Sequence, residues 1–189
     1  MKDSKIRCGW AGSDPIYIDY HDNDWGKPVY DDRKLFEMLI LEGAQAGLSW
    51  ITILKRADGY RAVFDNFDWT ICAAYTDEQL EEKRQDARII RNRLKVNSVR
   101  INALAFQQIV DEFGSFSNYL WKFTGNKPIV NNFETLATMP ATTPLSDIIS
   151  KDLKKHGFKF VGSTIIYAYM QAVGLVNDHI VDCFVRGLD

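Results

Sequence analysis

Two cysteines and two histidines near opposite ends of the chain form a first set of residues that could do chemistry. Cys8 and His21 lie near the N-terminus, and His179 and Cys183 lie near the C-terminus. His179 and Cys183 are four residues apart, so they share one face of a helical turn. Two thiolates and two imidazoles complete the tetrahedral coordination of Zn²⁺ and leave no position for a substrate. The residues therefore allow a structural zinc site; the alternative is two buried apolar cysteines and two hydrogen-bonded histidines.

A second candidate set combines aromatic rings with one carboxylate. Four aromatic residues fall within sixteen positions of the N-terminal segment: Trp10, Tyr17, Tyr20 and Trp25. Glu42 lies in the string LEGAQAGLSW, eight residues before Trp50. Burial of a carboxylate in an apolar helix face is unfavourable without a partner, and a cationic ligand held between aromatic rings is one such partner. The pattern indicates a pocket for a cation; the alternative is that Glu42 pairs locally while the tryptophans fill the core.

A third candidate is the basic stretch at residues 83–100. It holds seven Lys or Arg residues and one Asp, a local excess of +6 in a chain whose net charge is −2. The stretch spans a predicted helix–turn–helix with Ile89 and Ile90 at the turn. Such a turn directs backbone N–H groups and basic side chains at DNA phosphates without reading sequence. The alternative is a solvated helix face.

The segment that carries the first aromatic residues is expected to be a looped or extended cap. Residues 1–32 contain seven Asp and four Lys or Arg and have poor helical periodicity. Asp31 or Asp32 then caps a helix with a broad apolar face. Gly43 and Gly47 interrupt that helix or mark a close backbone approach. A further apolar-periodic stretch begins at Ser49 and supplies the position of Trp50.

The remaining elements are also predicted to be helices. Thr76 and Gln79 have the spacing of a capping box, and Gly114 suits the C-cap of a long helix that ends at Phe113. The predicted ranges are 76 onward, 92 or 97 to 113, 146–155 and 162–173. Strand-like alternation is almost absent, so the predicted fold class is all-α.

Composition narrows the class of protein further. The 189 residues are 46% hydrophobic and 25% charged, a globular balance that excludes a disordered chain. No apolar run reaches the roughly 18–20 residues that span a bilayer, and the N-terminus has no signal-peptide core. Three cysteines do not make a disulfide scaffold, and Cys72 is assigned to the core. The net charge argues against binding nucleic acid by bulk charge but allows a local basic patch.

Six segments together resemble the 3-methyladenine DNA glycosylase I family of constitutive, Tag-type enzymes. They are RCGW at 7–10, YHDNDWG at 20–26, LFEMLILEGAQAGLSWITILKR at 35–56, QDARIIRNRLK at 85–95, GFKFVGSTIIY at 157–167 and MQAVGLVNDHIVDC at 170–183. The resemblance covers nearly the whole chain in one order, and LEGAQAGLSW, GFKFVG and GLVNDH are its most specific strings.

This resemblance implies a fold and a metal. The expected fold is an all-α, helix-hairpin-helix DNA glycosylase-like unit over residues 1–189, with the hairpin region at about 76–113. One structural Zn²⁺ per chain is expected to join the N- and C-terminal segments. Its implied ligands are Cys8, His21, His179 and Cys183. The resemblance further implies a monomer in the bacterial cytoplasm, with the nucleoid and without a membrane partner.

The resemblance also implies an activity, the hydrolysis of the N-glycosidic bond of 3-methyladenine in double-stranded alkylated DNA. The base is flipped from the stack and released as free 3-methyladenine, leaving an abasic site, and no lyase activity is expected. Glu42 and Tyr20 are expected to hydrogen-bond the base edge while Trp50 stacks on its face. Trp10 and Trp25 are expected to wall the pocket. Glu42 is the expected catalytic residue, as recogniser and electrostatic partner rather than as a general base.

The expected DNA contacts lie in two places. Leu48 resembles the side chain that fills the gap left in the duplex, and Gln45 lies beside it. The basic hairpin contributes the others: Arg88, Arg91, Arg93 and Lys95. Arg88 is a departure, because the family has a turn glycine there. If that position needs a positive φ, Arg88 costs about 1 kcal/mol or more.

Two other functions remain open at this point. A non-catalytic DNA-damage binder would keep the pocket but lack competent DNA docking at Arg88. A zinc-dependent hydrolase of a small molecule would need an open metal position. Whether 3-methylguanine is also excised is left open by these residues.

Overall fold

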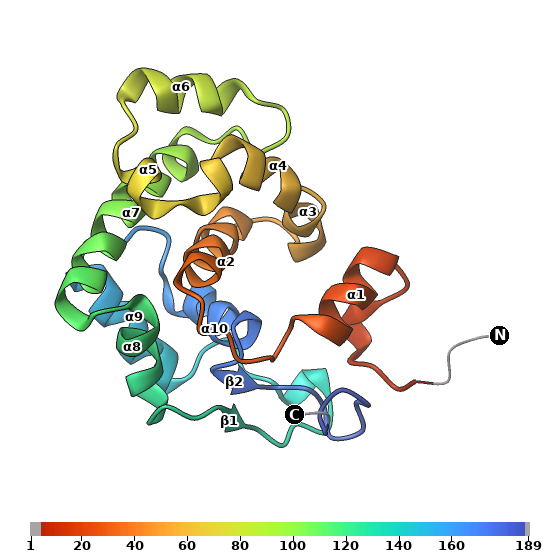
Figure 1. Ribbon diagram of the computed structural model, residues 1–189. Helices are drawn as coiled ribbons and strands as arrows, with labels where there is room; N and C mark the ends of the chain where they lie inside the picture. The colour runs from red at the N-terminus through yellow and green to blue at the C-terminus, as the bar shows by residue number, and fades with distance from the viewer. Residues whose placement is uncertain (1–4, 188–189) are drawn as a thin grey trace.

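A computed structural model describes residues 5–187 of the chain and has a mostly helical fold, as predicted (Figure 1). The helices are α1 (Pro15–Asn23), α2 (Asp32–Gln45), α3 (Trp50–Leu54), α4 (Ala57–Val63), α5 (Trp69–Ala73), α6 (Asp77–Gln85), α7 (Arg93–Phe113), α8 (Phe116–Trp121), α9 (Pro144–Lys155) and α10 (Ser163–Ala172). Two short strands, β1 (Ile129–Val130) and β2 (Val176–Asn177), pair in parallel. Among the described residues, no helix is both long and apolar enough to cross a membrane.

The N-terminal segment differs from the prediction, because it contains the helix α1. The Asp14 carboxylate accepts a hydrogen bond from the Ile16 N–H, and Pro15 occupies the first turn. An Asp-Pro start of this kind favours a helix even where apolar periodicity is weak. The buried residues of α1 are Tyr20 and His21. The helix was missed because its buried face consists of aromatic and polar side chains instead of an aliphatic stripe.

The helix α2 runs through the centre of the fold and packs against α10, α7 and α3. Its N-cap is Asp31, whose carboxylate accepts a hydrogen bond from the Lys34 N–H, as the sequence predicts. Gly43 does not interrupt the helix. A Cβ atom at Gly43 would lie 3.1 Å from the Phe160 Cβ, so the glycine allows a close approach between segments. Gly47 follows the end of α2 and has a φ of +77°, a backbone conformation that lets the chain turn away from the helix.

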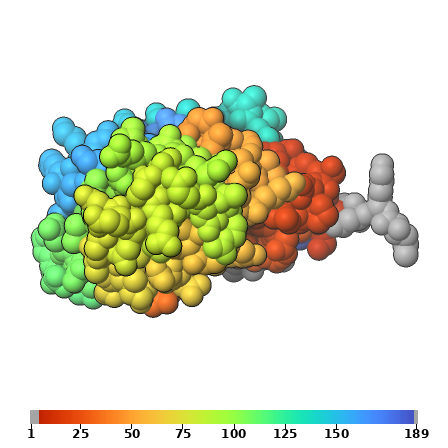
Figure 2. Space-filling view, turned by 90° about the horizontal axis from the view of Figure 1, so that it is seen from above, coloured from red at the N-terminus to blue at the C-terminus, as the bar shows by residue number. Residues whose placement is uncertain are grey.

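The helices α6 and α7 are joined by the connection at residues 86–92, and both have the predicted caps. Thr76 and Gln79 form the capping box of α6. Asn92, not Asn97, is the N-cap of α7, and Gly114 ends that helix with a φ of +80°. In Figure 2 the yellow-green surface of this region faces the viewer, next to the orange segment of α3 and α4. The basic stretch therefore lies at the surface of the molecule.

The connection between α6 and α7 carries no strain at Arg88. Arg88 is not among the described residues with a positive φ, so the condition for the expected energetic cost is not met. Glycine is instead required at Gly59, where a Cβ atom would lie 2.7 Å from the Arg88 carbonyl oxygen. The Arg88 guanidinium pairs with the Asp86 carboxylate at 2.6 Å. The arginine is accommodated because its backbone packs on a glycine of α4.

Candidate functional site

A cavity of about 170 Å³ opens between the N-terminal segment, α2, α3 and α10. All five residues expected to bind a base line it: Trp10, Tyr20, Trp25, Glu42 and Trp50. Gln45 and Tyr17, a member of the predicted aromatic set, line it as well, together with three residues for which no role was expected: Met139, Ala168 and Gln171. Nothing in the sequence singled out these three as pocket residues. The structure thus brings the aromatic and carboxylate set into one pocket.

Short local elements position the rings of this pocket. Tyr17 and Tyr20 are three residues apart on α1, so both point from the same helix face. The rings of Trp10 and Trp25 lie 5.0 Å apart in an edge-to-face arrangement. The Tyr20 and Trp50 rings lie 5.4 Å apart and are tilted by 49°. These contacts fix the rings against one another as the walls of one pocket.

Glu42, near the C-terminal end of α2, supplies the carboxyl group of the pocket. Its side chain is 3% exposed, and its Oε2 atom has no hydrogen-bond partner among the described residues. Burial raises the pKa of Glu42 to about 8. The indole Nε1 of Trp50 is also buried without a partner. Unpaired buried polar atoms are rare in folded proteins and indicate a ligand that pairs with them.

Lys95 holds the loop that follows Glu42. Its Nζ atom donates hydrogen bonds to the carbonyl oxygens of Ala44 at 2.8 Å and Ala46 at 2.6 Å. Burial lowers the pKa of Lys95. The loop exposes Leu48, whose side chain is 39% accessible to solvent. The expected role of Lys95 as a direct DNA contact stays a prediction, since in this structure its ammonium group ties α7 to the end of α2.

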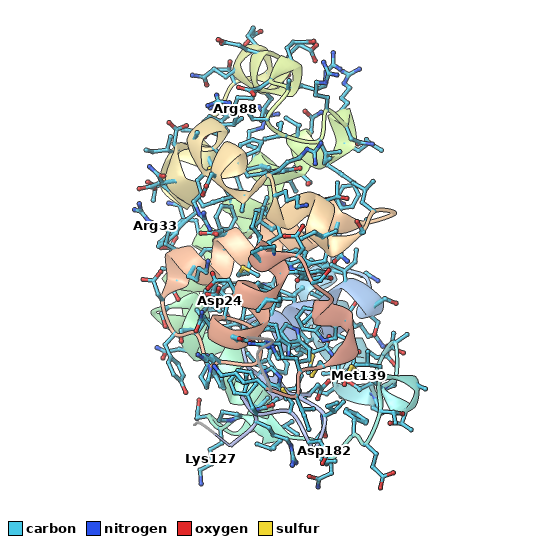
Figure 3. All side chains as sticks on the ribbon, turned by 90° about the vertical axis from the view of Figure 1, so that its right-hand side faces the viewer. Asp24, Arg33, Arg88, Lys127, Met139 and Asp182 are labelled. Carbon is cyan, nitrogen blue, oxygen red and sulfur yellow. The ribbon has the colours of Figure 1, made fainter. Side chains whose placement is uncertain are left out.

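The three hairpin arginines are exposed and do not line the pocket. Arg88 lies at the far end of the molecule from Met139, a pocket residue (Figure 3). Arg91 and Arg93 are exposed at the start of α7. This arrangement presents positive charge beside the first turn of a long helix, a position at which backbone N–H groups can bind an anion.

The four predicted metal ligands meet in one buried cluster. The donor atoms of Cys8, His21, His179 and Cys183 all lie within 4.8 Å of one another. The Cys183 Sγ atom lies 3.5 Å from the His21 Nε2 atom and 3.4 Å from the His179 Nδ1 atom. Tetrahedral Zn²⁺ with bonds of about 2.3 Å to sulfur and 2.0 Å to nitrogen separates such atoms by about 3.5 Å. The spacing of the donors therefore fits a zinc ion.

Neighbouring groups orient both histidines toward the cluster. The Nδ1 atom of His21 lies 2.7 Å from the Asp22 carboxylate, and the Nε2 atom of His179 lies 3.0 Å from the Trp25 carbonyl oxygen. Each of these contacts places the ring proton on the outer nitrogen and turns the lone pair of the inner nitrogen toward the cluster. Burial raises the pKa of the Cys8 thiol to about 12. A cation is therefore needed to hold that sulfur as a thiolate.

Comparisons with known proteins agree with one another. The family model described as methyladenine glycosylase matches residues 10–186. The chain is 52% identical to DNA-3-methyladenine glycosylase 1 of Escherichia coli, covering 94% of this chain and 95% of the relative. It is 46% identical to DNA-3-methyladenine glycosylase of Haemophilus influenzae, over 94% of this chain and 96% of the relative. A Staphylococcus aureus structure that describes 3-methyladenine recognition by 3-methyladenine DNA glycosylase I superposes with a TM-score of 0.94 at 33% identity, covering 97% and 98% of the two chains.

Proposed function

Because the chain belongs to the methyladenine glycosylase family, we propose that it hydrolyses the N-glycosidic bond of 3-methyladenine in alkylated DNA. The released base and an abasic site are the products of this step of base-excision repair. The observation that carries the proposal is the unpaired Glu42 carboxyl group inside an aromatic pocket. An N3-alkylated adenine in DNA carries a positive charge, so it supplies the cation that this group lacks.

In this mechanism the main task of the pocket residues is to recognise the methylated base. The cationic base leaves with the electron pair of its glycosidic bond and becomes neutral, while a water molecule bonds to the sugar carbon and loses a proton to solvent. Glu42 and Tyr20 hydrogen-bond the base edge, and Trp50 stacks on its face. Stacking contributes about 1–3 kcal/mol per base, and a hydrogen bond to a charged group about 1.5–3 kcal/mol. No residue is nominated to activate the water, and no amine is assigned to lyase chemistry.

The base reaches the pocket only after leaving the duplex, and two surfaces are proposed to support this step. The pair α6 and α7 acts as the helix-hairpin-helix, which binds a phosphate at the α7 N-terminus with Arg91 and Arg93 beside it. Leu48 fills the gap in the duplex, and Gln45 accompanies it at the mouth of the pocket. Arg88 has an unstrained backbone, so the structure offers no specific reason to prefer a non-catalytic damage binder.

The buried cluster is proposed to hold one structural Zn²⁺ through Cys8, His21, His179 and Cys183. When bound, the ion supplies a crosslink between the N- and C-terminal segments. All four positions of a tetrahedral ion are taken by protein donors, which leaves none for a substrate and disfavours a zinc hydrolase. We further propose that residues 1–189 act as one monomeric unit associated with the bacterial nucleoid.

A base-release assay tests the proposal directly. Metal-loaded protein is incubated with methylated double-stranded DNA, and the released bases are separated by chromatography. We expect free 3-methyladenine and abasic sites in equal amounts, without strand cleavage by the protein. Folded protein that contains zinc but releases no 3-methyladenine would show that the proposed activity is wrong.

A further inference from the structure

Gln171, near the end of α10, lines the aromatic pocket but has no place in the mechanism above. Its Nε2 atom donates a hydrogen bond to the Asp178 Oδ2 atom at 2.8 Å. The same nitrogen lies 3.1 Å from the sulfur of Met139. Both amide hydrogens are therefore directed at acceptors of the protein, away from any ligand.

Asp178 is the group that sets this orientation. Its side chain is fully buried and also accepts hydrogen bonds from Asn131 Nδ2 at 2.7 Å and from the Tyr167 hydroxyl at 2.5 Å. An ionised carboxylate accepts hydrogen bonds and donates none. If the amide of Gln171 were flipped, its oxygen would face a carboxylate oxygen, which is repulsive. The NH₂ group must therefore face Asp178, whatever ligand is bound.

The carbonyl oxygen of Gln171 is left for the pocket. None of the described residues donates a hydrogen bond to this Oε1 atom. Glu42 contributes a second unpaired acceptor, its Oε2 atom, to the same cavity. We infer that Gln171 is a specificity-determining residue whose carbonyl oxygen accepts a hydrogen bond from the exocyclic amine of an adenine-type base. The inference rests on the proposed function.

The groups at C6 explain why the carbonyl oxygen of Gln171 discriminates between adenine-type and guanine-type bases. An adenine-type base carries an amine at C6 with two N–H donors, and Glu42 and Gln171 supply two acceptors. A guanine-type base carries a carbonyl oxygen at C6, which would face the Gln171 oxygen without a proton between them. Sites that hydrogen-bond a polar group of the substrate reject analogues that lack it, because buried acceptors are then left unpaired. The pocket is therefore built to favour 3-methyladenine over 3-methylguanine.

The test is the Gln171→Met variant, which has a side chain of similar length without the carbonyl oxygen. Asp178 keeps its bonds from Asn131 and Tyr167, so the fold is expected to persist. DNA methylated at both purines is the substrate, and the initial rates of 3-methyladenine and 3-methylguanine release are measured together. We expect the ratio of the two rates to fall by about tenfold or more, mainly through slower 3-methyladenine release.

Two controls separate this role from a structural one. Gln107→Met makes the same change at an exposed position of α7 and should keep the ratio of the parent protein. A purely structural role for Gln171 would slow release of both bases equally, and an unchanged ratio in Gln171→Met would overturn the inference. Release of neither base by the parent protein would contradict the proposed function instead. In that event the relative affinities of parent and variant for the two free bases, read from tryptophan fluorescence, decide the role of Gln171.

Discussion

Glu42 is a carboxyl group that the free protein buries without giving its Oε2 atom a hydrogen bond. Such a group destabilises the folded state whenever it is ionised, because desolvation penalises the charge. The position makes physical sense for a site whose ligand brings a positive charge. Stability is reduced in the free protein and is recovered when the cationic base binds.

The Glu42→Gln variant should separate recognition from stability. Burial raises the pKa of Glu42 from 4.5 to about 8, so its acid form favours folding fully below pH 4.5, and that contribution is lost as the pH rises toward 8. The variant has no such titration. We expect the free energy of unfolding of the parent protein to fall relative to the variant between pH 5 and pH 8. The expected size is about 1.4 kcal/mol for each unit of pKa difference.

The variant should also lose 3-methyladenine release, since a neutral amide attracts the cationic base in DNA less strongly. Affinity for the neutral free base should fall because an amide NH₂ replaces one carboxyl oxygen that pairs with the base edge. Urea unfolding at several pH values and the base-release assay measure the two effects. A parallel loss of stability and activity at every pH would instead assign Glu42 a structural role.

At the scale of single residues, the sequence predicted the members of the pocket better than their orientation. Tyr20 and Trp25 share one short segment, and Glu42 and Trp50 share another, so the contact of two segments assembles most of the cavity. Gln171 could not be predicted. Its orientation depends on hydrogen bonds to Asp178 and Met139, and the sequence string that contains Gln171 and Asp178 does not show which way the amide faces.

At the scale of elements, the end of α2 is held from outside the helix. The C-terminal carbonyl groups of a helix lack intrahelical partners, and Lys95 of α7 supplies donors to two carbonyl oxygens there. The residues between Glu42 and Leu48 are thus tied to the helix that begins at the proposed phosphate site. Lys95 is therefore placed to position the loop as well as to contribute charge.

The Lys95→Met variant distinguishes positioning from direct phosphate contact. Loss of two charged hydrogen bonds should reduce the free energy of unfolding by about 1–3 kcal/mol and slow base excision from DNA. A positioning role leaves the salt dependence of DNA binding unchanged, whereas a phosphate contact would lower its slope by about one unit. Binding measured at several salt concentrations decides between them. Lys127→Met, at an exposed lysine, is the control for a change in net charge.

What the sequence predicted and what it missed differ in how far apart the contacting residues lie along the chain. The helix α1 begins with Asp14 and Pro15, a signal that outweighs its weak periodicity. The helix caps at Thr76, Asn92 and Gly114 could be predicted from the sequence because each depends on residues a few positions apart. The sequence left open whether Arg88 needs a positive φ, and it does not; the glycine that makes room for its backbone lies in α4, at Gly59. Sequence patterns could not predict the contacts between distant segments.

At the scale of the whole molecule, a net charge of −2 conceals two regions of opposite sign. Acidic residues gather in the N-terminal segment, which walls the pocket, and basic residues gather around the connection between α6 and α7. This separation suits a substrate with a cationic base and anionic phosphates. The mostly helical fold was readable from periodicity, whereas the short β1–β2 pair near the C-terminal segment was not.

The cluster of Cys8, His21, His179 and Cys183 joins the N- and C-terminal segments, and the Cys183→Ser variant tests the proposal that it holds Zn²⁺. The hydroxyl of serine binds Zn²⁺ weakly, so we expect zinc content to fall from one ion per chain and the melting temperature to drop. Affinity for 3-methyladenine should fall as well, because Tyr20 and Trp25 come from the segment that the ion anchors. Cys72→Ser, which alters a buried cysteine outside the cluster, should retain its zinc. Chelator treatment of the parent protein should reproduce the Cys183→Ser behaviour, while an unchanged zinc content and melting curve in that variant would contradict the structural role of the ion.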